Sequence, residues 1–293
     1  MRQLFIIITF LVIIFTACEK DKAPISGCTD STAFNYNSDA IVDDGSCEYN
    51  QSVSTNLTID FTQTVNANNL ILGLGCLDGN ECLPDHACCL GTLPYTNNAG
   101  QKYNIKKLWY LISNITLHTE VGTENLIKNI HFIDVSDPTT LSFLVSDLED
   151  NNYTSISYTI GLDTTRNTSN EYVNEDFHTK MFWPELMGGG YHYMKLEGNY
   201  IKLEGGSNND APFYNTHTGG TMGVDYSFNH SDEISLITDN TTSEVSISIN
   251  MEVNNWYQNP NSITLSSDGI MSNMTMQIQL NENGIDVFST LIN

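Results

Sequence analysis

The segment VSISINMEV, residues 245–253, alternates apolar and polar side chains without interruption. Successive side chains of a strand point to opposite faces, so this alternation predicts a strand with one buried and one exposed face. Residues 57–61, 156–160 and 274–280 carry the same pattern and predict further strands. Turns rich in Gly, Asn and Asp separate these segments. We therefore predict an all-β fold, an antiparallel β-sandwich with long loop insertions.

The N-terminal end has the features of an exported lipoprotein. Arg2 precedes an apolar run over residues 4–15, which is shorter than the ~20 residues of a membrane-spanning helix but suits the apolar region of a signal peptide. The following Phe15-Thr16-Ala17-Cys18 resembles a bacterial lipobox. We therefore expect a lipoprotein signal peptide over residues 1–17 and lipidation of Cys18. The alternative is an ordinary signal peptide followed by an unrelated cysteine.

Lipidation would fix the chain to the outer membrane of a bacterial cell envelope, facing either the periplasm or the cell surface. Residues 18–27 would form a short polar tether after the lipidated cysteine. We expect a small cysteine-bounded segment over residues 28–49 and a β-sandwich domain over residues 50–293.

Cysteine usage agrees with export. The chain has seven cysteines, and six remain once Cys18 is set aside, an even number that predicts disulfides in an oxidising compartment. Cys28 and Cys47 lie in one short segment, and we expect them to pair. The other four, which we expect to pair among themselves in an order that stays open, are Cys76, Cys82, Cys88 and Cys89. A thiolate metal cluster is the alternative for these four, and it fits an oxidising compartment less well.

Side-chain oxygens are frequent between Cys28 and Cys47. The candidates are Asn35, Asn37, Asp39, Asp43 and Asp44. Hard oxygen ligands of this kind suit calcium, and the segment resembles a small repeat of bacterial surface proteins that has been likened to calcium-binding thrombospondin type 3 repeats. An acidic spacer closed by a disulfide is the equal alternative.

The charge balance and the absence of enzyme motifs narrow the possible functions. Eleven Lys and Arg against 35 Asp and Glu give a net charge of −24, which excludes nucleic acid as a partner because phosphates are bound by clustered basic residues. The sequence has no nucleophile elbow and no zinc-protease helix motif. No carboxylate pair stands out as a glycosidase dyad among so many acids. We expect a protein that is not an enzyme.

Candidate metal ligands gather around the triple glycine at residues 188–190. The strand that follows carries His192 and Met194, which we expect on one face. If it pairs with the strand of His217 through a tight turn at residues 204–205, the two imidazoles face each other; a longer loop would separate them. Two histidines beside a thioether or an aromatic ring suit Cu(I). The outer ligands that we expect are Met181, Trp183 and His178, whereas the single histidines on other strands are interpreted as structural.

A series of short motifs runs from residue 95 to residue 219. They are Tyr95-Thr96-Asn97-Asn98-Ala99-Gly100, Tyr103 through Ile115, Ile160-Gly161-Leu162-Asp163, Met181-Phe182-Trp183, Gly190-Tyr191-His192, Leu196-Glu197-Gly198, and Phe213 through Gly219. In this order they resemble the MbnP-like family of copper-binding proteins, and the resemblance extends over roughly residues 56–293.

This resemblance implies an exported β-sandwich that binds copper through histidines and an oxidised tryptophan, kynurenine. It also implies a di-haem peroxidase-like partner protein that oxidises the tryptophan. His217 matches the family's histidine-containing strand and Trp183 matches its aromatic box, whereas His192 stands where many relatives have another residue. The leading hypothesis is a lipid-anchored protein of copper acquisition or storage. The alternative is a surface adhesion lipoprotein whose loops bind a partner and whose histidines are structural.

Overall fold

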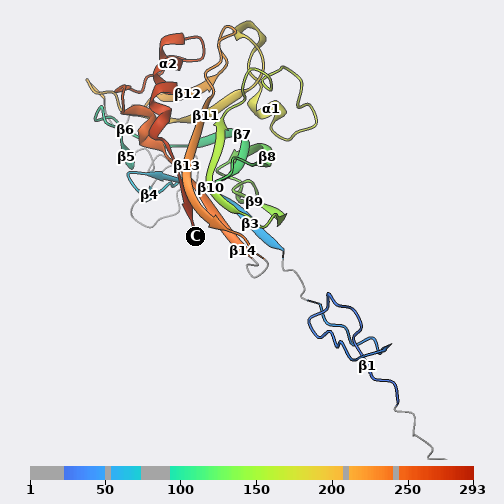
Figure 1. Ribbon diagram of the computed structural model, residues 1–293. Coiled ribbons are helices and arrows are strands. Elements are labelled where there is room, and N and C mark those ends of the chain that lie inside the picture. Colours follow the sequence, from blue (N-terminus) through green and yellow to red (C-terminus); the bar gives the residue numbers. More distant parts are fainter. Residues whose placement is uncertain (1–22, 50–53, 74–92, 207–210, 240–243) are drawn as a thin grey trace, which may run out of the picture. The chain divides into compact units, whose positions relative to one another are not determined.

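The structure is a computed structural model, and it describes residues 23–49, 54–73, 93–206, 211–239 and 244–293. The chain divides into two compact units, Met1–Ser52 and Val53–Asn293 (Figure 1). The expected signal peptide and Cys18 lie outside the described residues. So do the four cysteines between residues 76 and 89.

The smaller unit is held by one disulfide and a minimal sheet. Strands β1 (Ser26–Gly27) and β2 (Val42–Asp43) pair in parallel. Cys28 and Cys47 are joined, with their Cα atoms 4.7 Å apart, which confirms the expected bond. A loop of this length contributes about 3 kcal/mol in the chain-entropy account of disulfides.

The larger unit contains two main sheets, which confirms the all-β prediction. The first has the order β12-β11-β7-β10-β13, with β8 on the other edge of β7; the second has the order β15-β14-β3-β4, with β9 beside β3. The strands of the first sheet are β7 (Lys107–Thr119), β8 (Glu124–Asp134), β10 (Asn152–Ile160), β11 (His192–Asn199), β12 (Phe213–Gly219) and β13 (Phe228–Ile237). Those of the second are β3 (Thr55–Val65), β4 (Asn68–Asn69), β9 (Ser142–Leu148), β14 (Glu244–Glu252) and β15 (Phe288–Ile292).

The remaining elements are short. Strands β5 (Tyr95–Thr96) and β6 (Lys102–Tyr103) form a separate two-stranded sheet. The helical elements are η2 (Pro138–Thr140), α1 (His178–Met181), η3 (Glu185–Met187), η4 (Val253–Tyr257), α2 (Met274–Asn283) and η5 (Gly284–Asp286). Within the described part of the chain, no helix is long and apolar enough to cross a membrane.

The alternation in residues 245–253 has the consequence that we predicted. Ile247, Ile249 and Met251 are buried in β14, and their polar neighbours are more exposed. Most strand pairs in the two sheets are antiparallel, but β14 pairs with β3 in parallel. A parallel pair requires a long connection between its strands, and here all strands of the first sheet lie between β3 and β14 in the sequence.

The strand predicted at residues 274–280 is wrong, because this segment belongs to helix α2. The Asn273 side chain accepts a hydrogen bond from the Met276 amide at 3.1 Å and caps the helix. Gln277 and Leu280 are buried, three residues apart, whereas Ile278 is 46% exposed. Burial therefore follows the helical period, and the alternation of apolar residues in this segment does not correspond to a buried face.

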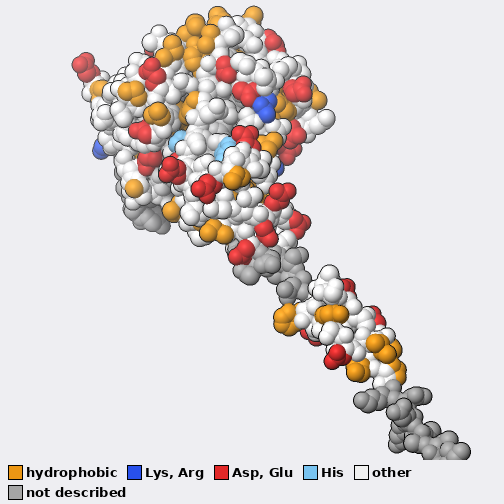
Figure 2. Space-filling model, in the orientation of Figure 1, with side chains coloured by type: hydrophobic (Ala, Val, Ile, Leu, Met, Phe, Trp, Pro, Cys, Tyr) orange, Lys and Arg blue, Asp and Glu red, His pale blue; other side chains and the backbone are white. Residues whose placement is uncertain are grey.

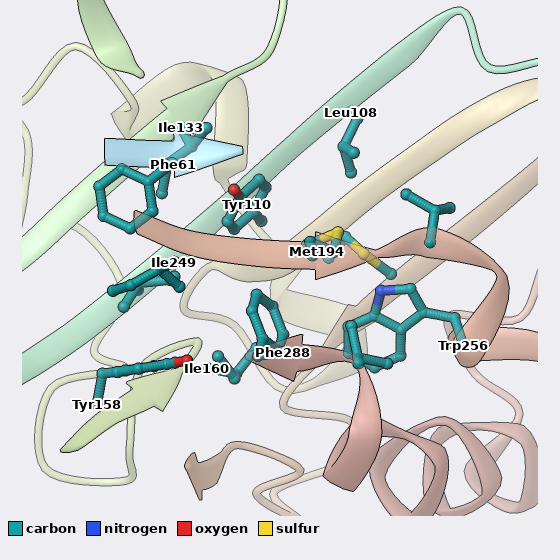
Figure 3. Packing of buried hydrophobic residues seen from close by; sticks show 14 of the residues in the cluster. Phe61, Leu108, Tyr110, Ile133, Tyr158, Ile160, Met194, Ile249, Trp256 and Phe288 are labelled. Atoms are coloured by element: carbon teal, nitrogen blue, oxygen red, sulfur yellow. The ribbon is translucent and has the colours of Figure 1, made fainter. Parts of the chain in front are cut away.

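The main hydrophobic core lies between the two sheets (Figure 3). Met194 of β11 and Ile249 of β14 both belong to it, so it joins strands of both sheets. A second, smaller cluster contains Leu111, Phe177, Met181 and Tyr191. It packs the loop between β10 and β11 onto the first sheet, and the candidate site lies beside it.

Candidate metal centre

The loop before β11 contains three consecutive glycines with positive φ angles. Gly188, Gly189 and Gly190 have φ angles of 118°, 72° and 86°, a region that strongly favours glycine. A Cβ at Gly190 would lie 2.4 Å from the Asn167 Oδ1 atom. That same oxygen accepts a hydrogen bond from the Tyr191 amide at 2.7 Å. The triple glycine therefore lets the chain make a tight turn and enter β11 in a fixed orientation.

The register of β11 and β12 differs from the one that a tight turn at residues 204–205 would give. His192 pairs with Gly219, the register shifts between His192 and Met194, and His217 pairs with Lys195. Of the two connections that we considered, the structure has the longer one, because β11 ends at Asn199 and β12 begins at Phe213.

The two imidazoles nevertheless meet. The rings of His192 and His217 have centroids 5.0 Å apart and lie nearly perpendicular, at 84°. His217 is two residues from Gly219, the partner of His192, so the histidines are diagonal neighbours across the strand pair. We expected Met194 on the same face as His192, but it packs instead in the core between the sheets. The register shift at Tyr193 separates the two.

Trp183 fills the space that Gly219 leaves beside His192. A Cβ at Gly219 would lie 2.6 Å from the Trp183 Cε3 atom. The indole is fully buried and contacts the His192 ring edge to face, with centroids 4.6 Å apart. Its Nε1–H group donates to the Met187 carbonyl at 3.3 Å. Trp183, which we expected as an outer ligand, is therefore packed against His192.

His192 has one ring nitrogen engaged and one without a partner. Its Nδ1 atom lies 3.0 Å from the Met181 carbonyl oxygen, so it carries the hydrogen and donates. Burial, followed by the charge of Lys195 and by His217, lowers the pKa of His192 to about 2. The ring is therefore neutral, and its Nε2 atom bears a lone pair. Nε2 is buried and has no hydrogen-bond partner among the described residues.

His217 has the same arrangement with a different anchor. Its Nε2 atom lies 2.9 Å from the Glu197 Oε1 atom, and the other carboxylate oxygen accepts a hydrogen bond from Lys107 at 2.8 Å. Burial opposes the ionisation of Glu197, but the hydrogen bonds from His217 and Lys107 outweigh it and lower its pKa to about 2. An ionised carboxylate only accepts, so His217 donates from Nε2. In the neutral ring this places the lone pair on Nδ1, which is buried and has no partner in the described structure.

The other expected outer ligands lie near the pair in different roles. Met181 is fully buried in the smaller cluster, and its carbonyl anchors His192. His178 contacts Tyr191 instead, with its Nδ1 atom 2.9 Å from the phenol oxygen. Across the described residues, no three or more side chains from His, Cys, Asp and Glu converge as a metal-binding group. The donor set here consists of two imidazoles.

Sequence reasoning missed the residues that orient the imidazoles. Glu197 anchors His217, and Lys107 holds Glu197 in place. The alternation Lys195, Leu196, Glu197 places the two charged residues on one face of β11, with Leu196 in the core. This alternation was the sequence signal for the missed contacts, because charged side chains on an otherwise buried strand need polar partners.

The calcium candidates are engaged in local hydrogen bonds. Asn37, Asp43 and Asp44 each accept from a backbone amide two residues further along the chain, at 3.0 Å. Asn35 binds the backbone at Ser46 and Glu48, which joins the two ends of the unit. Three of these side chains thus form local turns, and Asn35 makes longer-range contacts to the backbone. The fifth candidate, Asp39, is exposed.

Comparison with known proteins identifies one family. A sequence model of the MbnP family matches residues 54–276 of this chain. Among solved structures, the chain is similar to MbnP from Methylosinus trichosporium, with 10% sequence identity, a TM-score of 0.50, and coverage of 81% of this chain and 98% of that one. At this identity the similarity concerns the fold. No curated protein matches this chain.

Proposed function

The chain belongs to the MbnP family, and we propose that it binds one copper ion, as Cu(I), between His192 and His217. The observation that carries the proposal is the pair of unpartnered buried nitrogens, His192 Nε2 and His217 Nδ1, on rings whose centroids are 5.0 Å apart. A buried polar atom without a partner costs about 1–3 kcal/mol. Two such atoms on adjacent rings are accounted for if one ion takes both lone pairs.

The surroundings of the two rings support the assignment. Metal-binding histidines commonly donate their other N–H group to a carbonyl or a carboxylate, which fixes the tautomer and the ring orientation. His192 does this with the Met181 carbonyl and His217 with Glu197. Neutral imidazole is a good ligand for copper, and Cu(I) tolerates few and soft ligands. Both Glu197 oxygens already accept hydrogen bonds, which leaves the imidazoles as the donors for the ion.

The proposed role is copper acquisition or storage by a protein that is not an enzyme, anchored to the outer membrane through Cys18. Trp183 supports a further part of this proposal, because its indole contacts His192. We include its oxidation to kynurenine by a di-haem peroxidase-like partner. Mass spectrometry of the protein from its native host tests this step, since the peptide containing Trp183 would change in mass.

A competition titration with a Cu(I) chelator under reducing conditions tests the proposed site. We expect one Cu(I) per chain in the wild type and loss of that binding in His192→Ala and His217→Ala. His131→Gln is the control, because His131 is also mostly buried but donates to the Thr140 carbonyl from a different part of the first sheet. Unchanged Cu(I) binding in both alanine variants would refute the site.

A further inference from the structure

Three ammonium groups surround one indole on the first sheet. The Nζ atoms of Lys107, Lys180 and Lys195 lie 4.7, 5.5 and 5.8 Å from the centroid of the Trp109 ring. The chain has only 11 Lys and Arg against 35 Asp and Glu, and acidic side chains dominate the charged groups on the face shown in Figure 2. Three lysines around one ring are therefore a marked concentration of positive charge for this protein.

This cluster adjoins the two histidines. Lys195 pairs with Trp109 on one side of β11 and with His217 on the other. Its ammonium donates to the Lys180 carbonyl, and the next carbonyl along the chain, that of Met181, anchors His192. The Lys195 charge also contributes to the lowered pKa of His192. Lys195 is thus linked to both ligands, through the strand pairing and through the end of α1.

The local charge balance is positive. Lys107 forms an ion pair with Glu197 at 2.8 Å and Lys180 with Asp134 at 3.5 Å, whereas Lys195 donates to a carbonyl. The three ammonium groups and two carboxylates leave one excess positive charge. The group that carries it, Lys195, is half-buried, and burial lowers its pKa. Its charge is therefore screened less than that of an exposed lysine.

We propose that Lys195, supported by Lys107 and Lys180, makes the His192–His217 site selective for monovalent over divalent cations. The repulsion between a fixed charge and a bound ion is proportional to the charge of the ion. Each ammonium group therefore lowers the association constant of a monovalent ion by some factor. It lowers the association constant of a divalent ion by the square of that factor. This inference rests on the proposed function, because it assumes that the two imidazoles bind a cation. Lys195 acts as a specificity-determining residue that does not touch the ion.

The test compares Ag(I), a redox-stable monovalent probe, with Zn(II) on the full chain. Association constants are measured for the wild type, for Lys195→Met, which keeps an unbranched side chain but removes the charge, and for Lys128→Met as a control. Lys128 lies over the Phe143 ring, away from this cluster. The double variant His192→Ala/His217→Ala measures cation binding elsewhere on the chain, and this background is subtracted. In Lys195→Met we expect Ag(I) to bind about tenfold and Zn(II) about a hundredfold more tightly, and neither to change in Lys128→Met.

Lys180→Met is measured alongside and decides the test if Lys195→Met does not fold. Because Lys180 is paired with Asp134 and its side chain is 38% exposed, we expect smaller changes in both association constants. The factor for Zn(II) should still be the square of the factor for Ag(I). Equal factors for Ag(I) and Zn(II) in the folded variants would overturn the proposed selectivity and leave the copper site intact. Failure of the wild type to bind Ag(I) at the two histidines would instead overturn the proposed function as well.

Discussion

His131 and the His192–His217 pair are two histidine environments in the same sheet, and they differ in one respect. His131 stacks on Phe61 with a ring separation of 4.9 Å, and burial lowers its pKa to about 4. His192 is likewise buried and neutral. His131 has no buried nitrogen without a partner, whereas His192 and His217 have one each. Burial and neutrality are therefore common to His131 and His192, and the unpartnered nitrogen distinguishes them.

Filling the space at Gly219 is the largest expected disruption of the pair. In Gly219→Ala the new Cβ would lie 2.6 Å from the Trp183 ring, so the indole must move against His192. We expect loss of tight Cu(I) binding and a decrease of about 1–3 kcal/mol in the free energy of unfolding. Chelator competition and chemical denaturation measure the two effects.

Gly269→Ala is the matched control for this change. No atom lies within 4 Å of a Cβ built at Gly269, so this variant is expected to bind Cu(I) and to unfold like the wild type. Wild-type copper affinity in a folded Gly219→Ala protein would show that the packing of Trp183 against His192 does not matter for the site.

The second prediction concerns the proton on His217. Glu197 accepts from Nε2 and so keeps the lone pair on Nδ1. In Glu197→Gln the amide can donate to Nε2 instead, which allows the other tautomer and protonates Nδ1. We expect Cu(I) affinity to fall about 10- to 100-fold, the range for loss of an anchoring partner of a metal ligand.

Glu124→Gln provides the control for the carboxylate. Glu124 lies 3.8 Å from His118, a histidine outside the pair, and its side chain is 74% exposed. We expect no change in Cu(I) affinity. Nitrogen NMR of the imidazole rings reports the tautomer directly, and a His217 ring that keeps its proton on Nε2 in Glu197→Gln would contradict the explanation even if affinity fell.

The parts of the fold that the sequence predicted are those set by local patterns. The alternation in β14 arises because one face of that strand packs in the core, and Cys28 and Cys47 pair within one short segment. Helix α2 was not predicted because Met276 and Ile278 alternate with polar residues, as they would in a strand. The Asn273 cap and the burial of Gln277 favour the helix instead. Local alternation indicates a face only where tertiary packing uses it.

The site was predicted in part, for a similar reason. His192, His217 and Trp183 were named from their types and from the resemblance to a family, and the structure brings them together. The register that joins them depends on a shift at Tyr193 and on the absence of a side chain at Gly219. Neither feature can be predicted from a local sequence pattern. Glu197 and Lys195 were missed because their roles exist only across strands.

The third prediction concerns His131→Gln, a substitution that is expected to change the pH dependence of stability and to leave copper binding unchanged. The pKa of His131 is about 4 in the folded protein and about 6.5 in the unfolded chain. Between these values the unfolded chain binds a proton that the folded protein does not, so the free energy of unfolding falls as the pH decreases from about 6.5 to about 4. Denaturation of metal-free protein across this range should show His131→Gln with a slope smaller by up to about 1.4 kcal/mol per pH unit. An unchanged slope would mean that His131 is protonated in the folded protein over this range. His131 and His192 would then differ in charge as well as in the unpartnered nitrogen.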